Sequence, residues 1–127
     1  MEHTYYFDGN TKKISWTIES NETRSDQTRI HTEDYYEKIS VEQSKYVALH
    51  TGIFWGIGRF IIKNGDMVNI MLDLKSMFEH LAENKTINDT FVNTRVGFIR
   101  QLVDQRRLVI KYQTIDQKNN KATALLA

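Results

Sequence analysis

Alternating hydrophobic and polar positions characterise the first part of the chain. Between residues 13 and 18 every second residue is apolar, which predicts a half-buried β-strand with Ile14, Trp16 and Ile18 on its inner face. An aromatic, β-favouring run precedes this segment and ends in the turn-forming sequence Asp8-Gly9-Asn10, and a more polar strand-like stretch follows it. The predicted strands of this part are residues 4–7, 13–18 and 24–31. Their order predicts an antiparallel meander.

A helical spacing of apolar positions begins after residue 40. Ser40 and Gln43 carry the signature of a capping box, in which two side chains satisfy free N–H groups of the first helical turn. The apolar positions that follow at spacings of four, four and three are Leu49, Ile53, Ile57 and Phe60. This stripe predicts a long helix facing a core. Gly52 and Gly56, four residues apart, favour close packing of that helix.

The second half of the chain returns to a strand and then alternates between helical and extended patterns. A continuous apolar run over residues 67–72, interrupted only by Asn69, predicts a central strand covered on both faces and ending at Asp73. The elements predicted after Asp73 are a short helix around residues 77–81, an amphipathic helix over 91–105, a strand over 108–112 and a closing helix over 119–127.

The order of these elements predicts the fold class. It is three strands, a helix, a strand, two helices, a strand and a final helix, which predicts an α/β fold with a five-stranded mixed sheet covered by helices. The chain shows no internal repeat and no linker composition. Its 127 residues, 40% of them hydrophobic, are enough for one core, so residues 1–127 are expected to form a single domain.

The composition excludes several kinds of functional site. The chain has no cysteine, which excludes disulfides, thiolate metal sites and a cysteine nucleophile. Its four histidines lack metal-ligand spacing, and neither a Gly-x-Ser-x-Gly sequence nor a phosphate-binding glycine loop is present. The net charge of +1 gives no overall attraction to nucleic acid, although the last third of the chain is basic. Its basic residues are Arg95, Arg100, Arg106, Arg107, Lys111, Lys118 and Lys121.

The sequence gives no sign of a membrane or secretory segment. The N-terminal residues lack a basic stretch followed by an apolar core, and no apolar run approaches the roughly 20 residues that span a bilayer. We therefore expect an intracellular, cytoplasmic protein without a membrane partner.

The long predicted helix and three short motifs resemble ribonuclease H type 1 domains. The residues that match the first long helix of that family are Ser44, Tyr46, Ala48, Leu49, Gly52 and Ile53. The segment Tyr6-Phe7-Asp8-Gly9 is similar to the family's first-strand motif, and Met71-Leu72-Asp73 is similar to the motif at the end of its central strand. The residues that match its final motif are Asn119, Ala122 and Leu125. The order of the predicted elements is also the order found in these domains.

The resemblance implies a metal-dependent nuclease, but the acidic residues that it requires are incomplete. It implies that four carboxylates hold two magnesium ions, which hydrolyse the RNA strand of an RNA/DNA hybrid. Asp8 and Asp73 match two acidic positions, whereas Lys45 and Thr123 occupy the other two. The glycine-rich turn usual after the first aspartate is missing, and Leu74 stands where a serine is expected. An ammonium group cannot ligate magnesium, so we expect Lys45 to pair with the two aspartates in a metal-free arrangement.

Simpler roles for the two aspartates stay open at the level of the sequence. Asp8 precedes Gly9 and can be a turn residue. Asp73 precedes a predicted helix and can cap its N-terminus, where a carboxylate is favoured.

The sequence therefore supports two hypotheses of function. The first is a catalytically impaired ribonuclease H-like domain that binds nucleic acid, an RNA/DNA hybrid in particular, or a protein partner. The alternative is an active enzyme in which Glu42, nearly one turn before Lys45, replaces the missing ligand, so that Asp8, Glu42 and Asp73 bind Mg²⁺ or Mn²⁺. In that alternative, Asp116 or Thr123 completes the site.

Overall fold

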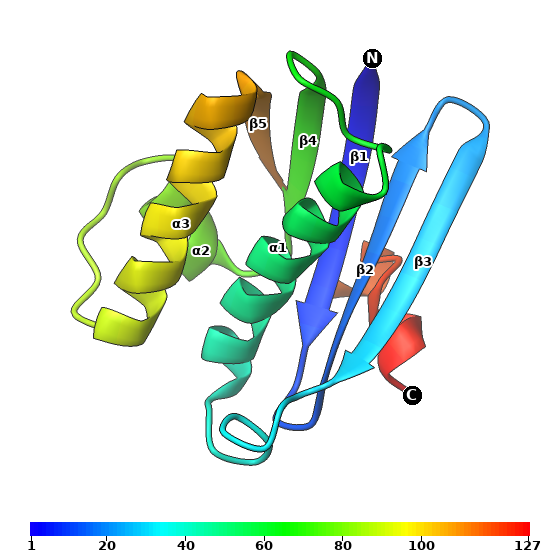
Figure 1. The fold of residues 1–127 in the computed structure, drawn as a ribbon. Coiled ribbons are helices and arrows are strands. Elements are labelled where there is room, and N and C mark those ends of the chain that lie inside the picture. Colours follow the sequence, from blue (N-terminus) through cyan, green and yellow to red (C-terminus); the bar gives the residue numbers. More distant parts are fainter.

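The computed structural model describes residues 1–127 as a five-stranded sheet with three α-helices (Figure 1). In chain order the elements are β1 (Glu2–Gly9), β2 (Lys13–Ser20), β3 (Thr23–Ile30), α1 (Val41–Gly58), β4 (Met67–Leu72), α2 (Lys75–Leu81), α3 (Thr90–Arg106) and β5 (Val109–Thr114), followed by the short 3₁₀ helices η1 (Gln117–Asn119) and η2 (Thr123–Leu126). None of the helices is both long enough and apolar enough to cross a membrane.

The sheet is mixed, with the strand order β3-β2-β1-β4-β5, which confirms the predicted fold class. β1, β2 and β3 form the antiparallel meander, and β4 pairs in parallel with β1 on one side and with β5 on the other. The last paired residues of β1 and β4 are Tyr5 and Ile70. Asp8 and Asp73 each lie three positions beyond this pair, where the two strands are no longer hydrogen-bonded and a side chain can enter between them.

Helix α1 packs across one face of the sheet (Figure 1). It begins at the predicted capping box, in which Ser40 and Gln43 exchange hydrogen bonds. Gly52 faces Tyr5 and Trp16 so closely that a Cβ atom at this position would overlap both side chains. The hydroxyl of Tyr5 donates to the carbonyl oxygen of Ala48 at 2.7 Å, so the helix is held to the sheet by a polar contact as well as by packing.

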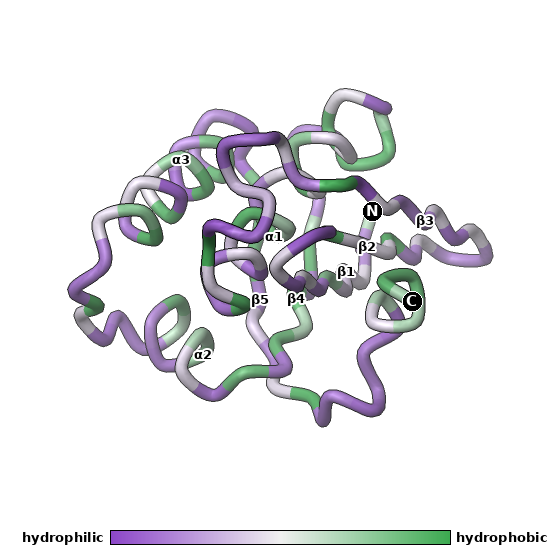
Figure 2. Tube along the Cα trace, turned by 90° about the horizontal axis from the view of Figure 1, so that it is seen from below, coloured by the Kyte–Doolittle hydropathy of each residue, from purple (hydrophilic) through white to green (hydrophobic).

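The other face of the sheet is partly covered by the C-terminal segment. Figure 2 shows α1 and α3 on one side of the sheet and the C-terminus on the other. Ser15 of β2 is buried against this segment and donates a hydrogen bond to the carbonyl oxygen of Ala122 at 2.7 Å. The prediction that β2 is half-buried was therefore wrong, because residues from the far end of the chain cover its polar face.

Three further predictions about local structure were wrong. The sequence Asp8-Gly9 does not turn but continues β1, and the turn follows at residues 10–12. Phe60 lies beyond the end of α1 with a positive φ of 60° and is 80% exposed, so it does not extend the apolar stripe. Residues 119–127 form no α-helix, because the buried side chain of Asn120 accepts the N–H of Ala122 and stops a regular helix from forming there.

Candidate functional site

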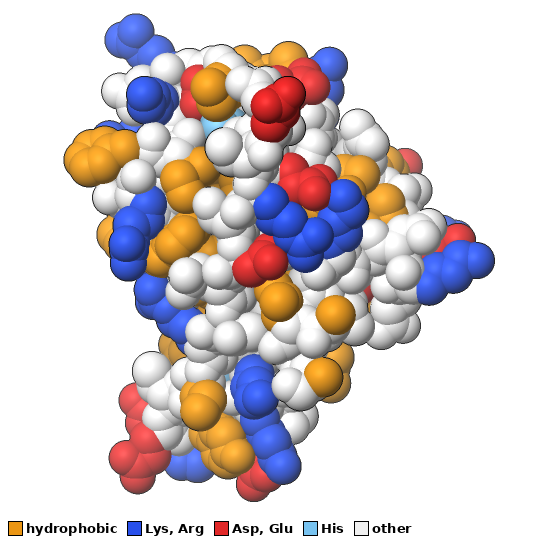
Figure 3. All heavy atoms as spheres, turned by 90° about the vertical axis from the view of Figure 1, so that its right-hand side faces the viewer, with side chains coloured by type: hydrophobic (Ala, Val, Ile, Leu, Met, Phe, Trp, Pro, Cys, Tyr) orange, Lys and Arg blue, Asp and Glu red, His pale blue; other side chains and the backbone are white.

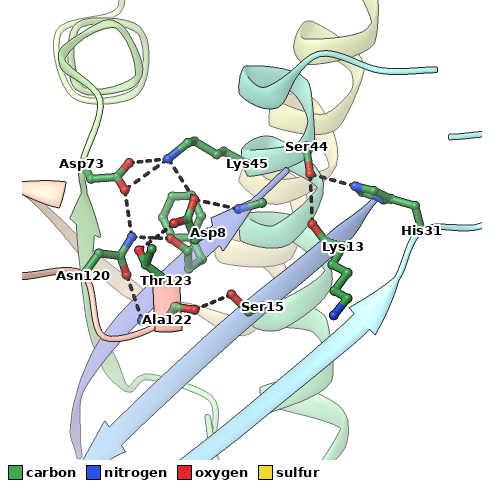
Figure 4. Close-up of polar contacts among 12 residues, drawn as sticks. Asp8, Lys13, Ser15, His31, Ser44, Lys45, Asp73, Asn120, Ala122 and Thr123 are labelled. Atoms are coloured by element: carbon green, nitrogen blue, oxygen red, sulfur yellow. Dashed lines mark hydrogen bonds and ion pairs between the residues drawn. The ribbon is translucent and has the colours of Figure 1, made fainter. Parts of the chain in front are cut away.

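The candidate site lies between the ends of β1 and β4, the second turn of α1 and the C-terminal segment (Figure 4). The Nζ atom of Lys45 is 2.9 Å from Oδ1 of Asp8 and 2.9 Å from Oδ1 of Asp73. It also lies 3.1 Å from Oδ2 of Asp73. The three side chains are at most 5% exposed. The expected ion pair between the lysine and both aspartates is therefore present.

Close approach of α1 to β1 brings Lys45 to this position. A Cβ atom at Gly9 would lie 2.9 Å from the backbone carbon and oxygen of Ser44, so only glycine fits there without moving the helix. The hydroxyl of Ser44 contacts Nε2 of His31 at 2.7 Å, which ties the same turn of α1 to the segment after β3. The Asp8-Gly9 sequence thus supplies both a carboxylate and the space for the helix that carries its partner.

Both carboxylates also accept hydrogen bonds from groups other than Lys45. Asp8 accepts the N–H of Gly9 on Oδ1 at 2.8 Å and the hydroxyl of Thr123 on Oδ2 at 2.6 Å. Asp73 accepts the side-chain amide of Asn120 on Oδ2 at 2.9 Å. The same amide group donates to the carbonyl oxygen of Phe7 at 2.8 Å. Every carboxylate oxygen therefore has a donor, as burial requires.

Asn120 is the site residue that the sequence analysis missed. The resemblance matched the neighbouring Asn119, which is exposed, whereas Asn120 is buried and contacts Asp73. The only signal in the sequence was the pair of adjacent asparagines, and periodicity does not distinguish between them because the segment is not helical.

The electrostatics of the site keep Lys45 charged. Burial by itself lowers the pKa of Lys45, but the hydrogen bonds and negative charges of Asp8 and Asp73 outweigh it, so the pKa of the ammonium lies above its ordinary value. At neutral pH an ammonium is therefore enclosed by two aspartates, and neutral donors from Gly9 and Thr123 complete the shell around Asp8.

The residues present do not fit a magnesium or manganese ion. Such an ion takes several oxygen ligands, and the ammonium already occupies the space between the two available carboxylates. Glu42 does not join them: its Oε1 atom accepts a hydrogen bond from Ser76 at 2.7 Å. The chain contains no group of three histidine, aspartate or glutamate side chains placed to hold a metal. Asp116 is exposed at the start of η1.

The simpler roles considered for the two aspartates do not apply. Asp8 belongs to β1 rather than to a turn. The N-cap of α2 is Leu74, and no side chain makes a capping hydrogen bond there, so Asp73 does not cap that helix. Its carboxylate points instead to Lys45 and Asn120 (Figure 4).

Comparisons with known proteins find similarity in structure but not in sequence. No protein-family model matches the chain, and no curated protein matches its sequence. The N-terminal ribonuclease H domain of a Mycobacterium tuberculosis protein superposes with a TM-score of 0.80 at 12% identity, covering 100% of this chain and 96% of that one. Ribonuclease H1 of the archaeon Halobacterium salinarum gives a TM-score of 0.76 at 15% identity over 98% of this chain and 94% of that one.

A third similar structure is LC11 ribonuclease H1, which was crystallised with an RNA/DNA hybrid. Its TM-score is 0.72 at 12% identity, and the match covers 94% of this chain and 88% of that one. At sequence identities this low, the similarity concerns the fold alone. Together the three structures show that the chain has a ribonuclease H-like fold.

Proposed function

From the ribonuclease H-like fold of this chain, we propose that it binds nucleic acid, in the first place an RNA/DNA hybrid, without hydrolysing it. The single observation that carries the absence of hydrolysis is the ammonium of Lys45, which sits between Asp8 and Asp73. Thr123 adds to it, because a hydroxyl replaces a carboxylate at a position that the resemblance expects to be acidic.

Lys45 cannot take over the chemistry of a metal ion. Hydrolysis of a phosphodiester in this fold calls for cations that polarise the phosphate and activate a water molecule. The ammonium of Lys45 is already engaged by short contacts to Asp8 and to both oxygen atoms of Asp73. An ammonium held in this way provides no coordination position for a phosphate oxygen or for water.

The proposal of nucleic-acid binding is supported by one neighbour and by unpaired basic residues. LC11 ribonuclease H1 was crystallised with an RNA/DNA hybrid. In this chain the exposed basic residues of the last third that make no ion pair are Arg100, Arg106, Arg107, Lys111 and Lys118. Figure 3 shows basic and acidic side chains next to each other on the face that it draws. We therefore expect modest affinity that falls with salt concentration.

The test combines metal binding, hybrid binding and cleavage on the same protein. Calorimetry with Mg²⁺ and Mn²⁺ should give no binding to the wild type, and fluorescence anisotropy should detect a labelled RNA/DNA hybrid even in the presence of a chelator. No cleavage of the hybrid is expected with either metal. Cleavage by the wild type that disappears in Asp73→Asn would refute the proposal.

Restoring the missing acids provides the matched gain-of-function test. The double variant Lys45→Glu with Thr123→Asp places four carboxylates at the site, so it should bind Mn²⁺ in calorimetry and can regain hydrolysis. Lys45→Gln with Thr123→Asn is the matched control, because it removes the ammonium without adding charge, and it should bind no metal. Equal metal affinity in both variants would show that the carboxylates are not what the site lacks.

The geometry does not support the alternative of an active enzyme built on Asp8, Glu42 and Asp73. Glu42 is engaged with Ser76 of α2 rather than with the aspartates. The alternative predicts that Glu42→Gln abolishes cleavage by the wild type, whereas our proposal predicts no cleavage to abolish. If neither the wild type nor the restored variant binds hybrid, contacts with proteins become the better account of this fold.

A further inference from the structure

A small polar pocket lies between the end of α2, the loop after it and α3, apart from the Lys45 site. Its volume is about 180 Å³. The residues that line it are His80, Asn84, Lys85, Thr86, Ile87, Asn93 and Arg100. Two of them are cationic, none is acidic and only one is hydrophobic. A pocket of this size is smaller than those that enclose drug-sized ligands, so it suits an ion or one group of a larger molecule.

His80 contributes a donor to this pocket. The residue as a whole is only 6% exposed. Its Nδ1 atom lies 2.8 Å from the hydroxyl of Tyr46, which is fully buried and has no other hydrogen-bond partner. Nδ1 is the one partner within reach of this hydroxyl, so we assign the hydroxyl as the donor, which places the imidazole proton on Nε2. Nε2 makes no hydrogen bond within the chain and is the donor left for the pocket.

Arg100 and the loop after α2 supply the other donors. One guanidinium nitrogen of Arg100 lies 3.4 Å from Oδ1 of Asn84, at the outer limit of a hydrogen bond, and the rest of the group has no partner. Thr86 lines the pocket and is exposed, so its hydroxyl is accessible to a ligand. Lys85 contacts Glu79 at 3.3 Å, but the lysine side chain is 66% exposed and can turn towards the pocket.

We propose that this pocket binds one phosphate group, with Arg100 as its charged partner and His80 Nε2–H and Thr86 as neutral donors. Several donors around a small space with no acidic lining suit an oxyanion, and guanidinium groups match the geometry of phosphate oxygens. The charge state of His80 fits this role. Burial and then the positive charge of Arg100 lower the pKa of His80, against a weaker opposite effect of Glu42, so the imidazole is neutral at neutral pH.

The phosphate group has two possible sources, a nucleic-acid backbone or a small phosphorylated molecule. The first source rests on the proposed function. The contact between Tyr46 and His80 links one wall of the pocket to the residue next to Lys45 on α1, although no residue of α1 lines the pocket itself. A backbone phosphate in the pocket would then hold a nucleic acid against α2 and α3.

Inorganic phosphate tests the pocket without reference to the proposed function. Titration of phosphate into the wild type should shift the imidazole resonances of His80 in nuclear magnetic resonance spectra. Arg100→Gln should weaken this binding by at least about tenfold, as expected for loss of a charge-assisted hydrogen bond. Arg106→Gln is the matched control, since Arg106 is also exposed on α3 but does not line the pocket. Equal effects of the two variants, or no shift at His80, would overturn the proposal.

An RNA/DNA hybrid distinguishes the two sources. If the pocket binds a backbone phosphate, Arg100→Gln should lower the slope of log affinity against log salt by about one and weaken hybrid binding clearly more than Arg106→Gln does, because Arg106 does not line the pocket. Phosphate binding without any binding of hybrid would keep the pocket as a site for small phosphates and refute the proposed function. Hybrid binding that Arg100→Gln and Arg106→Gln reduce equally, without phosphate binding at His80, would refute the pocket and leave the proposed function standing.

Discussion

At the scale of single residues, Lys45 decides the character of the site. A lysine in a polar, solvated position would be inconsequential, but here its ammonium is enclosed by two buried carboxylates. A buried ion pair adds little net stability compared with apolar residues, because desolvation of the charges offsets their attraction. Removal of one partner is costly, since it leaves the other charges buried without compensation.

Lys45→Met should therefore destabilise the protein by about 3–5 kcal/mol, because it leaves Asp8 and Asp73 facing each other without a counter-charge. Urea denaturation measures this change in the free energy of unfolding. Lys75→Met, at an exposed position of α2, is the control and should change stability by less than about 0.5 kcal/mol. A loss in Lys45→Met no larger than in the control would mean that the ion pair does not hold the site together.

At the scale of secondary-structure elements, the packing of α1 on the sheet depends on two glycines that have no space for a side chain. Gly9 lets the second turn of the helix approach β1, and Gly52 lets the middle of the helix approach Tyr5 and Trp16. The position of Lys45 between the strand ends thus follows from close contacts along the whole helix. By contrast, a Cβ atom at Gly97 of α3 would meet no neighbouring atom within 4 Å.

Because the two glycines have different environments, alanine substitutions at Gly52 and Gly97 should change the stability of the protein in opposite directions. Gly52→Ala should destabilise the protein by about 1–3 kcal/mol, because the added methyl overlaps Tyr5 and Trp16. Gly97→Ala should stabilise it by about 0.5–1 kcal/mol, because alanine restricts the unfolded chain and favours the helix. Thermal unfolding of both variants checks the pair, and two shifts in the same direction would contradict this account of α1 packing.

At the scale of the whole molecule, two polar clusters fix the opposite ends of β1. The cluster of Lys45, Asp8 and Asp73 lies at the end of β1, and a second cluster around Asp66 lies at its beginning. Oδ2 of Asp66 lies 2.8 Å from Nε2 of His3 and accepts the N–H of Lys63 at 2.8 Å. Burial raises the pKa of Asp66, but these hydrogen bonds and the N-terminal ammonium outweigh it and bring the pKa from 3.8 to about 2.

The lowered pKa of Asp66 predicts how stability depends on pH. The carboxylate of Asp66 binds a proton more tightly in the unfolded chain than in the folded one. Its contribution to the free energy of unfolding is therefore fully present above about pH 4 and is lost as the pH falls towards 2. Asp66→Asn should therefore cost about 1–2 kcal/mol at pH 7 and much less near pH 2. Urea denaturation of both proteins at the two pH values measures the difference, and a cost that does not change with pH would contradict the prediction.

The sequence by itself determined the kind and order of the elements. Periodicity placed β2, β4 and α3, and the Ser40–Gln43 capping box fixed the start of α1, because these signals arise from neighbours within a few residues. The resemblance then indicated that Asp8, Lys45 and Asp73 lie together in one site. Both inferences depend on patterns that the linear chain carries.

Only the tertiary structure decided which side chains complete the site. It brought Asn120 to Asp73 and Thr123 to Asp8, across 47 and 115 positions of the chain, and left Glu42 with Ser76. It also buried His80 beside a pocket that no motif marks. Contacts between distant segments leave no periodic signal in a single sequence, because they depend on the packing of elements rather than on the local preferences of the chain.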